Sequence, residues 1–397
     1  MAHDSGQAAQ VRWSGAAQLI ALVRSEPGIT RAAAAQRMGI GSGNATELVA
    51  RMRHARLLEE TPAPVRGRGR PTTVLGPHPA GPLALVVDLR AADWRLALAG
   101  IDGLPRVVAQ AGHPGEGFDR VRTRLATAIG SAYRGDAERI RAIVISVAGP
   151  ISGSTVGQLH TRGWPAVDLG GLTAEIPERA GVRLLVGNDA TLAGLAEART
   201  GAARDAATAL HLIVAHGLGG TLVVDGEPVD GAHGAAGEYG HIPFADPKLL
   251  CPCGARGCWD LTIDGRALAR HRGDAPPEDP VAYVHELLDR PKRDAKTRRA
   301  FEAVAASLGR GIGGLVNLHD PDVVTLGGVA AMLRAAAPAA FDDAYRAGLM
   351  AFRKASPPPV RDGVHGEEGP LRGGAALALD HLTTAVGLAD WVDRQGA

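Results

Sequence analysis

The sequence predicts an α/β protein in which a small helical N-terminal head precedes a large body of two lobes. Three observations lead to this prediction. At 397 residues the chain is too long for one ordinary hydrophobic core, so two or three domains are expected. Two helical patterns joined by a glycine-containing turn lie near the N-terminus. From Leu83 onward, strand-length apolar runs alternate with helical segments, which is typical of α/β proteins.

The head begins with an amphipathic segment, Ala16–Val23, that we expect to form a short helix. After a Pro-Gly break, Thr30 has the form of an N-cap for a second helix over Arg31–Met38. Gly39-Ile40-Gly41 then makes a tight turn into a third helix over residues 42–52. This spacing predicts a helix-turn-helix with an apolar residue inside the turn.

The third helix has the side chains that a DNA reader needs. Its first turns carry the small polar residues Ser42, Asn44 and Thr46, which suit contacts with base edges in a major groove. Arg51 follows on the same helix and is expected to reach phosphates. A generic three-helix scaffold that binds no nucleic acid is the alternative, because helix pairs with short turns are common.

The charge distribution favours the DNA interpretation. Residues 1–75 hold ten arginines, no lysine and five acidic residues, a balance of +5, so a total net charge of +1 leaves −4 for the rest of the chain. A basic head on a mildly acidic body indicates that the head meets a polyanion.

A predicted wing follows the third helix. Residues 57–60 resemble its first strand, and the run Arg66–Pro71 then alternates arginine with glycine. Arg68 and Arg70 on this slim basic segment are expected to enter a narrow minor groove. A solvated linker between domains is the alternative, because basic Gly-Pro-rich linkers are frequent.

A break in composition at Gly76–Pro82 predicts the domain boundary. We therefore expect residues 1–78 to form a winged helix-turn-helix domain and residues 79–397 to form the two-lobed body. The expected strands of the body are 83–88, 94–99, 142–147, 183–186, 210–215, 221–224 and 322–326. The expected helices are 118–133, 190–199, 281–288 and 297–317.

All three cysteines of the chain lie in one short stretch behind a histidine, as His241, Cys251, Cys253 and Cys258. Soft thiolates and an imidazole at this spacing, with tight-turn glycines between them, predict a tetrahedral structural zinc site. Three unrelated buried cysteines are the alternative. Glu238 precedes the histidine by three positions, so a turn would aim a carboxylate and a metal-held imidazole at one pocket.

The body contains further short motifs in a fixed order. They are Asn188-Asp189, Gly217-Leu-Gly219-Gly220 with Asp225-Gly226, Glu238-Tyr-Gly-His241, Cys251-Pro-Cys253-Gly-Ala-Arg-Gly-Cys258, Asp320-Pro-Asp322 through Gly327-Gly328, and Leu371–Leu379. Together they resemble the ROK family of repressors and sugar kinases, from about residue 83 to the end. The resemblance implies a sugar-kinase/actin-like fold, and the head resembles the winged helix-turn-helix of the family's regulators.

The resemblance also implies a sugar site. Asn188 and Asp189 match the family's sugar-contacting pair, with Asp189 at the position that acts as base in the kinases. Glu238 and His241 match two further sugar contacts, and zinc would fix the imidazole. Asp260 stands where the family usually has glutamate, a departure that affects which sugar is bound. As an alternative, Asn188 and Asp189 would only cap the helix that follows them.

Kinases of this family have a first phosphate-binding turn, Asp-x-Gly-Gly-Thr, and the corresponding run here is Asp88-Leu-Arg-Ala-Ala-Asp93. The aspartate is retained, but both glycines and the threonine are absent, so side chains would crowd the approach of phosphates to backbone N–H groups. Asp93 would add negative charge beside a triphosphate. The second turn, Gly217–Gly220, is intact, although such turns also close ordinary hairpins. We therefore expect kinase activity to be lost and assign no catalytic residue.

These features predict a sugar-responsive transcriptional regulator, expected to be a repressor. The head would bind operator DNA and the body a sugar or sugar derivative, whose binding would close the lobes and change the spacing of paired heads. A homodimer or homotetramer on a near-palindromic operator is expected. A sugar kinase for a hexose or amino sugar with an appended DNA-binding domain is the main alternative. A second alternative is a purely architectural DNA-binding oligomer whose sugar pocket is vestigial.

Cytoplasmic localisation is expected. The first residues lack the basic and apolar regions of a secretory signal, and apolar runs such as 83–87 and 210–215 are far shorter than a membrane span. Three cysteines that bind metal suit a reducing compartment. No membrane partner is predicted.

Overall fold

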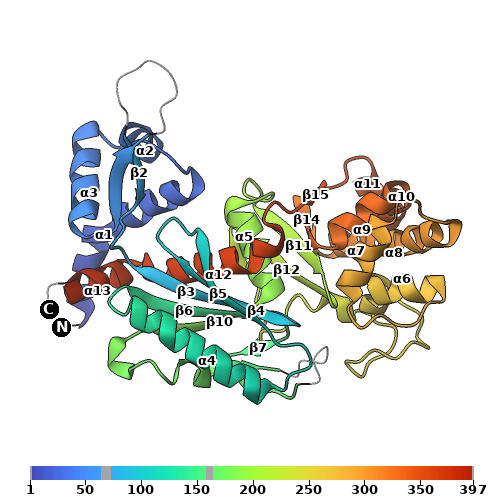
Figure 1. Ribbon diagram of the computed structural model, residues 1–397. Helices are drawn as coiled ribbons and strands as arrows, with labels where there is room; N and C mark the ends of the chain where they lie inside the picture. The colour runs from blue at the N-terminus through green and yellow to red at the C-terminus, as the bar shows by residue number, and fades with distance from the viewer. Residues whose placement is uncertain (1, 64–72, 158–163, 396–397) are drawn as a thin grey trace.

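The computed structural model describes residues 2–63, 73–157 and 164–395, and Figure 1 shows a head, in blue, beside the first of two lobes. Each lobe is built on a five-stranded sheet covered by helices, which confirms the α/β class. In the described part of the chain, no helix is long and apolar enough to cross a membrane.

The head consists of three helices and a two-stranded antiparallel sheet. Thr30 caps the second helix as expected, because its Oγ1 accepts a hydrogen bond of 3.1 Å from the Ala33 N–H. Gly39 ends this helix with φ +66°, a left-handed conformation that favours glycine. The first helix, α1, begins well before the expected 16–23 and also buries Trp13 in the core. The bounds are α1 Ala2–Ser25, α2 Arg31–Met38, α3 Ser42–His54, β1 Leu58–Pro62 and β2 Thr73–Pro77.

The first lobe contains a sheet of order β10-β6-β3-β4-β5, in which β6 and β10 run parallel to β3. Alternate residues of β3 belong to different cores: Leu85 and Val87 pack with α4, whereas Ala84 and Val86 pack with α12. Helices on both faces explain why this strand is almost continuously apolar. The bounds are β3 Leu83–Leu89, β4 Asp93–Ala99, β5 Pro105–Gly112, α4 Phe118–Gly135, β6 Ile140–Val147 and β10 Arg183–Asn188.

The second lobe contains a sheet of order β13-β12-β11-β14-β15. α5 packs closely on β11 and β12, since a Cβ added at Gly194 would overlap the Thr221 side chain. The opposite face joins α8 and α9 in one hydrophobic cluster. The bounds are α5 Asp189–Thr200, β11 Thr208–Val214, β12 Leu218–Val224, β13 Glu227–Pro228, α8 Ala295–His319, β14 Val323–Gly328, α9 Ala330–Ala336 and β15 Val360–Asp362.

The remaining elements are short strands, 3₁₀ turns and peripheral helices. The short strands and 3₁₀ turns are β7 Ile151–Ser152, β8 Thr155–Val156, β9 Val167–Asp168, η1 Gly170–Thr173, η2 Glu178–Ala180, η3 Tyr239–His241, η4 Trp259–Thr262 and η5 Gly366–Glu368. The helices are α6 Gly265–Arg272, α7 Pro280–Asp289, α10 Pro338–Gly348, α11 Ala351–Lys354, α12 Gly369–Leu382 and α13 Ala385–Gln395.

The C-terminal helices join the head to the first lobe (Figure 1). One hydrophobic cluster contains residues of α1, α3, β3, α12 and α13, so the core is continuous across the predicted boundary. The buried Trp391 indole N–H of α13 donates a hydrogen bond of 2.8 Å to the carbonyl of Ala55, the residue that ends α3. Arg24 of α1 forms an ion pair of 3.7 Å with Asp380 of α12. The head is therefore held against the body by both packing and polar contacts.

Candidate functional site

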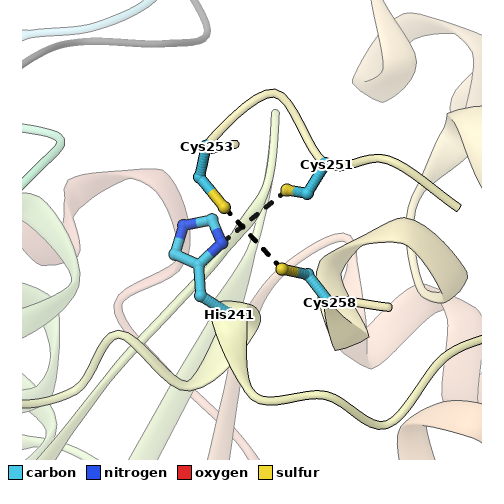
Figure 2. A group of neighbouring side chains, drawn as sticks. All are labelled: His241, Cys251, Cys253 and Cys258. Atoms are coloured by element: carbon cyan, nitrogen blue, oxygen red, sulfur yellow. Dashed lines mark hydrogen bonds between the residues drawn. The ribbon is translucent and has the colours of Figure 1, made fainter. Parts of the chain in front are cut away.

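The predicted metal ligands come together in the structure (Figure 2). One donor atom from each of His241, Cys251, Cys253 and Cys258 lies within 4.8 Å of all the others. The Cys253 and Cys258 sulfurs are 3.7 Å apart, and the Cys251 sulfur is 3.8 Å from His241 Nδ1. Two sulfurs that each lie about 2.3 Å from one tetrahedral ion would be separated by about 3.8 Å. The cluster therefore has the dimensions that a tetrahedral metal ion requires.

Local backbone geometry explains how the chain forms this cluster. A tight turn after Cys251 is closed by the Cys251 N–H to Ala255 carbonyl bond of 2.8 Å, and Gly254 adopts φ +93° within it. His241 is the last residue of η3, and Cys258 is the N-cap of η4. Two short 3₁₀ turns and one glycine turn thus aim all four side chains at one point.

Electrostatics favours a cation at the cluster. Burial raises the pKa of the Cys258 thiol to about 12, and burial also raises the pKa of Cys251. At Cys253 burial acts in the same direction, but the Ala255 N–H and the neighbouring thiols lower its pKa. Closely packed thiolates are unfavourable without a compensating positive charge, and a bound metal ion supplies that charge.

His241 connects the cluster to a neighbouring cleft. Its Nδ1 faces Cys251, while its Nε2 lies 3.7 Å from Glu238 Oε2. When one ring nitrogen binds a metal, the other is fixed as an N–H donor. The geometry therefore allows the cluster to orient an imidazole N–H and a carboxylate together.

A cavity of about 660 Å³ lies between the two lobes. All five residues predicted to contact a sugar line it, although they come from β10, α5, the η3 region and η4. They are Asn188, Asp189, Glu238, His241 and Asp260. The fold therefore brings together residues that are more than seventy positions apart in the sequence.

Asn188 and Asp189 also stabilise the start of α5. The Asn188 Oδ1 accepts a hydrogen bond of 3.1 Å from the Thr191 N–H, and its Nδ2 donates to the Gly149 carbonyl at 3.1 Å. Asp189 Oδ1 accepts a bond of 2.8 Å from the Ala190 N–H. The expected capping role is thus present, and it is compatible with lining the cavity.

Asp260 has a structural task that the sequence did not indicate. Its Oδ1 accepts a hydrogen bond of 2.6 Å from the Leu218 N–H, and Arg266 lies 3.3 Å from its Oδ2. Burial raises the pKa of this carboxyl group, and the nearby Asp264 adds to the rise. Asp260 therefore fixes the glycine-rich turn between β11 and β12, with part of its surface in the cavity.

The turn between β3 and β4 is closed by ion pairs. Arg90 Nε and Nη2 lie 2.7 and 2.9 Å from the two carboxylate oxygens of Asp93, a bidentate arrangement. Arg90 also reaches Glu367 at 3.2 Å. Arg95 lies 2.7 Å from the buried Asp88. Burial raises the pKa of the Asp88 carboxyl group, and Arg95 offsets only part of this rise. Paired charged side chains thus stand at the turn where the sequence resemblance expects a phosphate-binding loop.

The sequence could only partly indicate this network. Two acids and two arginines within Asp88–Arg95 were visible as a charge cluster, but Glu367 joins it only because α12 crosses to the first lobe. The run Gly217–Gly220, expected as a second turn, instead lies mostly in β12, where its glycines have a packing role. A Cβ at Gly219 would lie 2.7 Å from the Ala190 Cβ, and one at Gly220 would lie 2.7 Å from the Tyr239 ring. Its glycines are therefore required whether or not a phosphate is bound.

The residues of α3 that are predicted to contact DNA lie outside its buried face. Ser42, Asn44 and Thr46 are exposed, and Arg51 is half-buried. The buried face packs into the head through Ala45, Leu48, Val49 and Met52. Arg68 and Arg70 lie outside the described residues. The structure thus leaves the polar face of α3 accessible.

Comparisons with known proteins agree with this architecture. A ROK family domain matches residues 117–381. The chain is 31% identical over 242 residues to the N-acetyl-D-glucosamine kinase of Pectobacterium carotovorum subsp. carotovorum strain PC1, over 56% of this chain and 75% of that protein. It is 28% identical over 173 residues to the glucokinase of Streptomyces coelicolor, over 40% and 55% of the two chains.

Solved structures extend the likeness to the head. A ROK family transcriptional regulator, described as a homologue of the E. coli MLC protein, superposes with a TM-score of 0.71 at 22% identity, over 96% of this chain and 99% of that one. The ROK hexokinase of Thermus thermophilus gives a TM-score of 0.57 at 30% identity, over 74% and 97%. The regulator likeness concerns the fold. With a matched domain that spans more than half of its length and an N-terminal region before it, this chain belongs to the ROK family.

Proposed function

We propose that the chain is a sugar-responsive DNA-binding transcriptional regulator that acts as a repressor. Residues 1–78 would form the winged helix-turn-helix domain that binds operator DNA, and residues 79–397 would bind a sugar or sugar derivative. The observation on which the proposal chiefly rests is the closed turn between β3 and β4, where Arg90 and Asp93 form an ion pair, in a chain whose head we propose to bind DNA. Such a body can bind a sugar but is poorly suited to position a triphosphate.

The head supports DNA binding by its shape and its charge. The exposed polar start of α3 suits base contacts in a major groove, and the basic balance of residues 1–75 suits contacts with phosphates. The two strands β1 and β2 flank residues 64–72, which include Arg68 and Arg70. We propose these two arginines as contacts to the minor groove or the phosphates.

Zinc is the metal that the donor set fits best, because three thiolates and one imidazole in a tetrahedral cluster suit this ion. Bound zinc would supply structural cross-linking and fix the His241 ring. Glu238, Asn188, Asp189 and Asp260 would then contact sugar hydroxyls from the other sides of the cavity. Asp189 occupies the base position of the kinases, but here we propose that it binds rather than catalyses.

α12 offers a route from the cavity to the head. Its second residue, Pro370, and Glu367, just before the helix, line the cavity, whereas Asp380 near its C-terminal end pairs with Arg24 of α1. A sugar that favours one arrangement of the lobes would shift α12 and therefore the head. In a homodimer or homotetramer, this shift would change the spacing of two heads on a near-palindromic operator. We place this activity in the cytoplasm.

Fluorescence anisotropy on DNA from upstream of the protein's own coding sequence tests the DNA-binding part. The wild type should bind tightly at moderate salt, whereas Asn44→Ala should lose about 1–3 kcal/mol of binding free energy on its specific site. Asp119→Asn, an exposed change on α4, is the matched control and should bind like the wild type. Equal affinity of all three proteins for the specific site would contradict a base-reading role of α3.

A sugar kinase is the second candidate, because a relative at 31% identity is an N-acetyl-D-glucosamine kinase and Asp189 is retained. A coupled assay with ATP and a panel of hexoses and amino sugars tests it. Turnover on the order of 1 per second would establish the kinase and displace the proposal. The closed turn predicts that no such turnover is found.

A further inference from the structure

We infer that the interlobe cleft binds sugars without phosphate groups and discriminates against their phosphate esters, with Asp93 as a residue that determines this specificity. The inference rests on the proposed sugar-binding role of the cleft and adds the charge class of the ligand. It follows from the positions of the charged groups around the cavity.

Among the described residues, carboxylates outnumber guanidinium groups in the cavity lining by seven to two. A narrow cleft with low-dielectric walls concentrates the field of such an excess of one sign, which repels an anionic ligand. The seven carboxylates are Asp88, Asp93, Asp189, Glu238, Asp260, Asp279 and Glu367.

Neither arginine of the lining is available to neutralise a phosphate. Arg90 forms the bidentate pair with Asp93 at 2.7 and 2.9 Å and reaches Glu367 at 3.2 Å. Arg266 forms ion pairs with Asp264 at 2.5 Å and with Asp260 at 3.3 Å. A phosphate would therefore have to displace an existing charge-assisted pair and leave its carboxylate without a partner.

Two helix N-termini at the cavity, those of α5 and α12, carry carboxylates of the chain itself. α5 begins with Asp189, which accepts a hydrogen bond from the Ala190 N–H. α12, a helix of 14 residues, is preceded by Glu367 and Glu368. A free helix N-terminus attracts anions, but the negative charges beside these two N-termini oppose a bound phosphate there.

The same lining suits a ligand that donates hydrogen bonds. Ionised carboxylates act only as acceptors, so their partners must be O–H or N–H donors. A sugar offers several hydroxyl donors in a small volume, and an amino sugar adds an ammonium group. A cavity of about 660 Å³ accommodates such a molecule.

Isothermal titration of the full-length wild-type protein with matched pairs of probes tests the inference. The pairs are glucose with glucose 6-phosphate, N-acetylglucosamine with its 6-phosphate, and glucosamine with its 6-phosphate. For every pair that binds, the parent sugar should bind at least about tenfold more tightly than its ester, because like charges in the cavity oppose the ester.

Asp93→Asn then tests the named residue. The amide keeps a hydrogen-bond acceptor for Arg90 but removes one negative charge, so the preference for the parent sugar should shrink by about threefold or more. Asp119→Asn removes one charge from the distant α4 and should leave the preference unchanged. An unchanged preference in Asp93→Asn, with a folded protein by circular dichroism, would refute the role of Asp93.

Two other outcomes of the titrations distinguish a failure of the inference from a failure of the proposed function. An ester that binds the wild type more tightly than its parent sugar would overturn the inference and leave a regulator that responds to sugar phosphates. Failure of every parent sugar and every ester to bind would overturn the sugar-sensing function itself, and the inference with it.

Discussion

At the residue scale, the cluster of His241 and the three cysteines shows how residue types and spacing can predict a candidate metal site. The four candidate ligands were identified because they include every cysteine of the chain, and the structure places their donor atoms within 4.8 Å of one another. The ion pair of Arg90 with Glu367 was not predicted, because the two residues lie far apart in the sequence. The hydrogen bond from Arg266 to the His216 carbonyl was not predicted either, because its acceptor belongs to the backbone. Local pattern identifies a ligand set, but only the fold assigns a partner to each charge.

Cys253→Ser tests the cluster. The variant should lose most of its bound zinc, because serine replaces a soft thiolate with a weakly coordinating hydroxyl, and residues 237–260 should become more sensitive to proteolysis. Metal content by mass spectrometry measures the first effect. Lys248→Ala changes an exposed side chain of the same loop and should keep its zinc. Full zinc content in the serine variant would exclude Cys253 as a ligand.

His211 provides a prediction on pH dependence. It is buried in β11 with its Nδ1 2.9 Å from Thr325 Oγ1, and burial lowers its pKa to about 4 from an ordinary value of 6.5. The unfolded chain therefore binds a proton at higher pH than the folded protein, so stability falls as the pH decreases from about 6.5 towards about 4. Above this window the contribution of His211 is constant.

Thermal unfolding between pH 4 and pH 7 measures this effect. Replacing the buried ring by glutamine, His211→Gln, should lower stability near pH 7 and reduce its decline with decreasing pH. The exposed His233→Gln is the matched control and should follow the wild type. An identical slope for His211→Gln and the wild type would exclude His211 as the titrating group.

At the element scale, the sequence predicted the elements whose ends carry clear signals. α2 was expected over Arg31–Met38 and is found there, because Thr30 and Gly39 are strong cap residues. β5 and the helices α6 and α9 to α13 were not predicted. The run Leu371–Leu379 was visible only as a family motif, although it forms the middle of α12.

At the same scale, the contact between α13 and the end of α3 is expected to stabilise the protein. Trp391→Phe keeps a ring beside Arg141 but removes the N–H that bonds the Ala55 carbonyl, so the free energy of unfolding should fall by about 1–3 kcal/mol. Denaturant unfolding measures the loss. The control is Trp164→Phe in the first lobe, which likewise removes one indole hydrogen bond, of 3.2 Å to the Glu116 carbonyl.

If α13 positions the head, the two variants should differ in a second measurement. Trp391→Phe should reduce the change in DNA affinity that a bound sugar causes, whereas Trp164→Phe should preserve it. A full sugar response in Trp391→Phe would assign α13 a purely structural role.

The run Arg66–Arg70 is the other element to test. Replacing Arg68 and Arg70 by alanine should weaken DNA binding and flatten its salt dependence by about one unit of slope for each phosphate contact that is lost. If these arginines instead read a narrow minor groove, the loss should be greatest on A·T-rich flanks. Unchanged affinity on all sequences would assign the run to a plain linker.

At the scale of the whole molecule, the head, α12 and the cavity form one continuous structure. The shared hydrophobic cluster and the Arg24–Asp380 pair tie the head to the helix that borders the cavity. The sequence predicted a head and a two-lobed body but could not predict this connection, because its parts lie at opposite ends of the chain. Under the proposed function, this connection would give a sugar bound in the cavity a physical means of moving the head.

The most direct test of the account is the change in DNA affinity that a sugar causes in the absence of ATP. Fluorescence anisotropy would follow the full-length protein on its own upstream DNA, at fixed salt, with each parent sugar and each ester of the panel. The account predicts that one unphosphorylated sugar changes the affinity by about fivefold or more, a typical allosteric coupling. Tight DNA binding that no sugar alters, or a response that requires ATP, would contradict it.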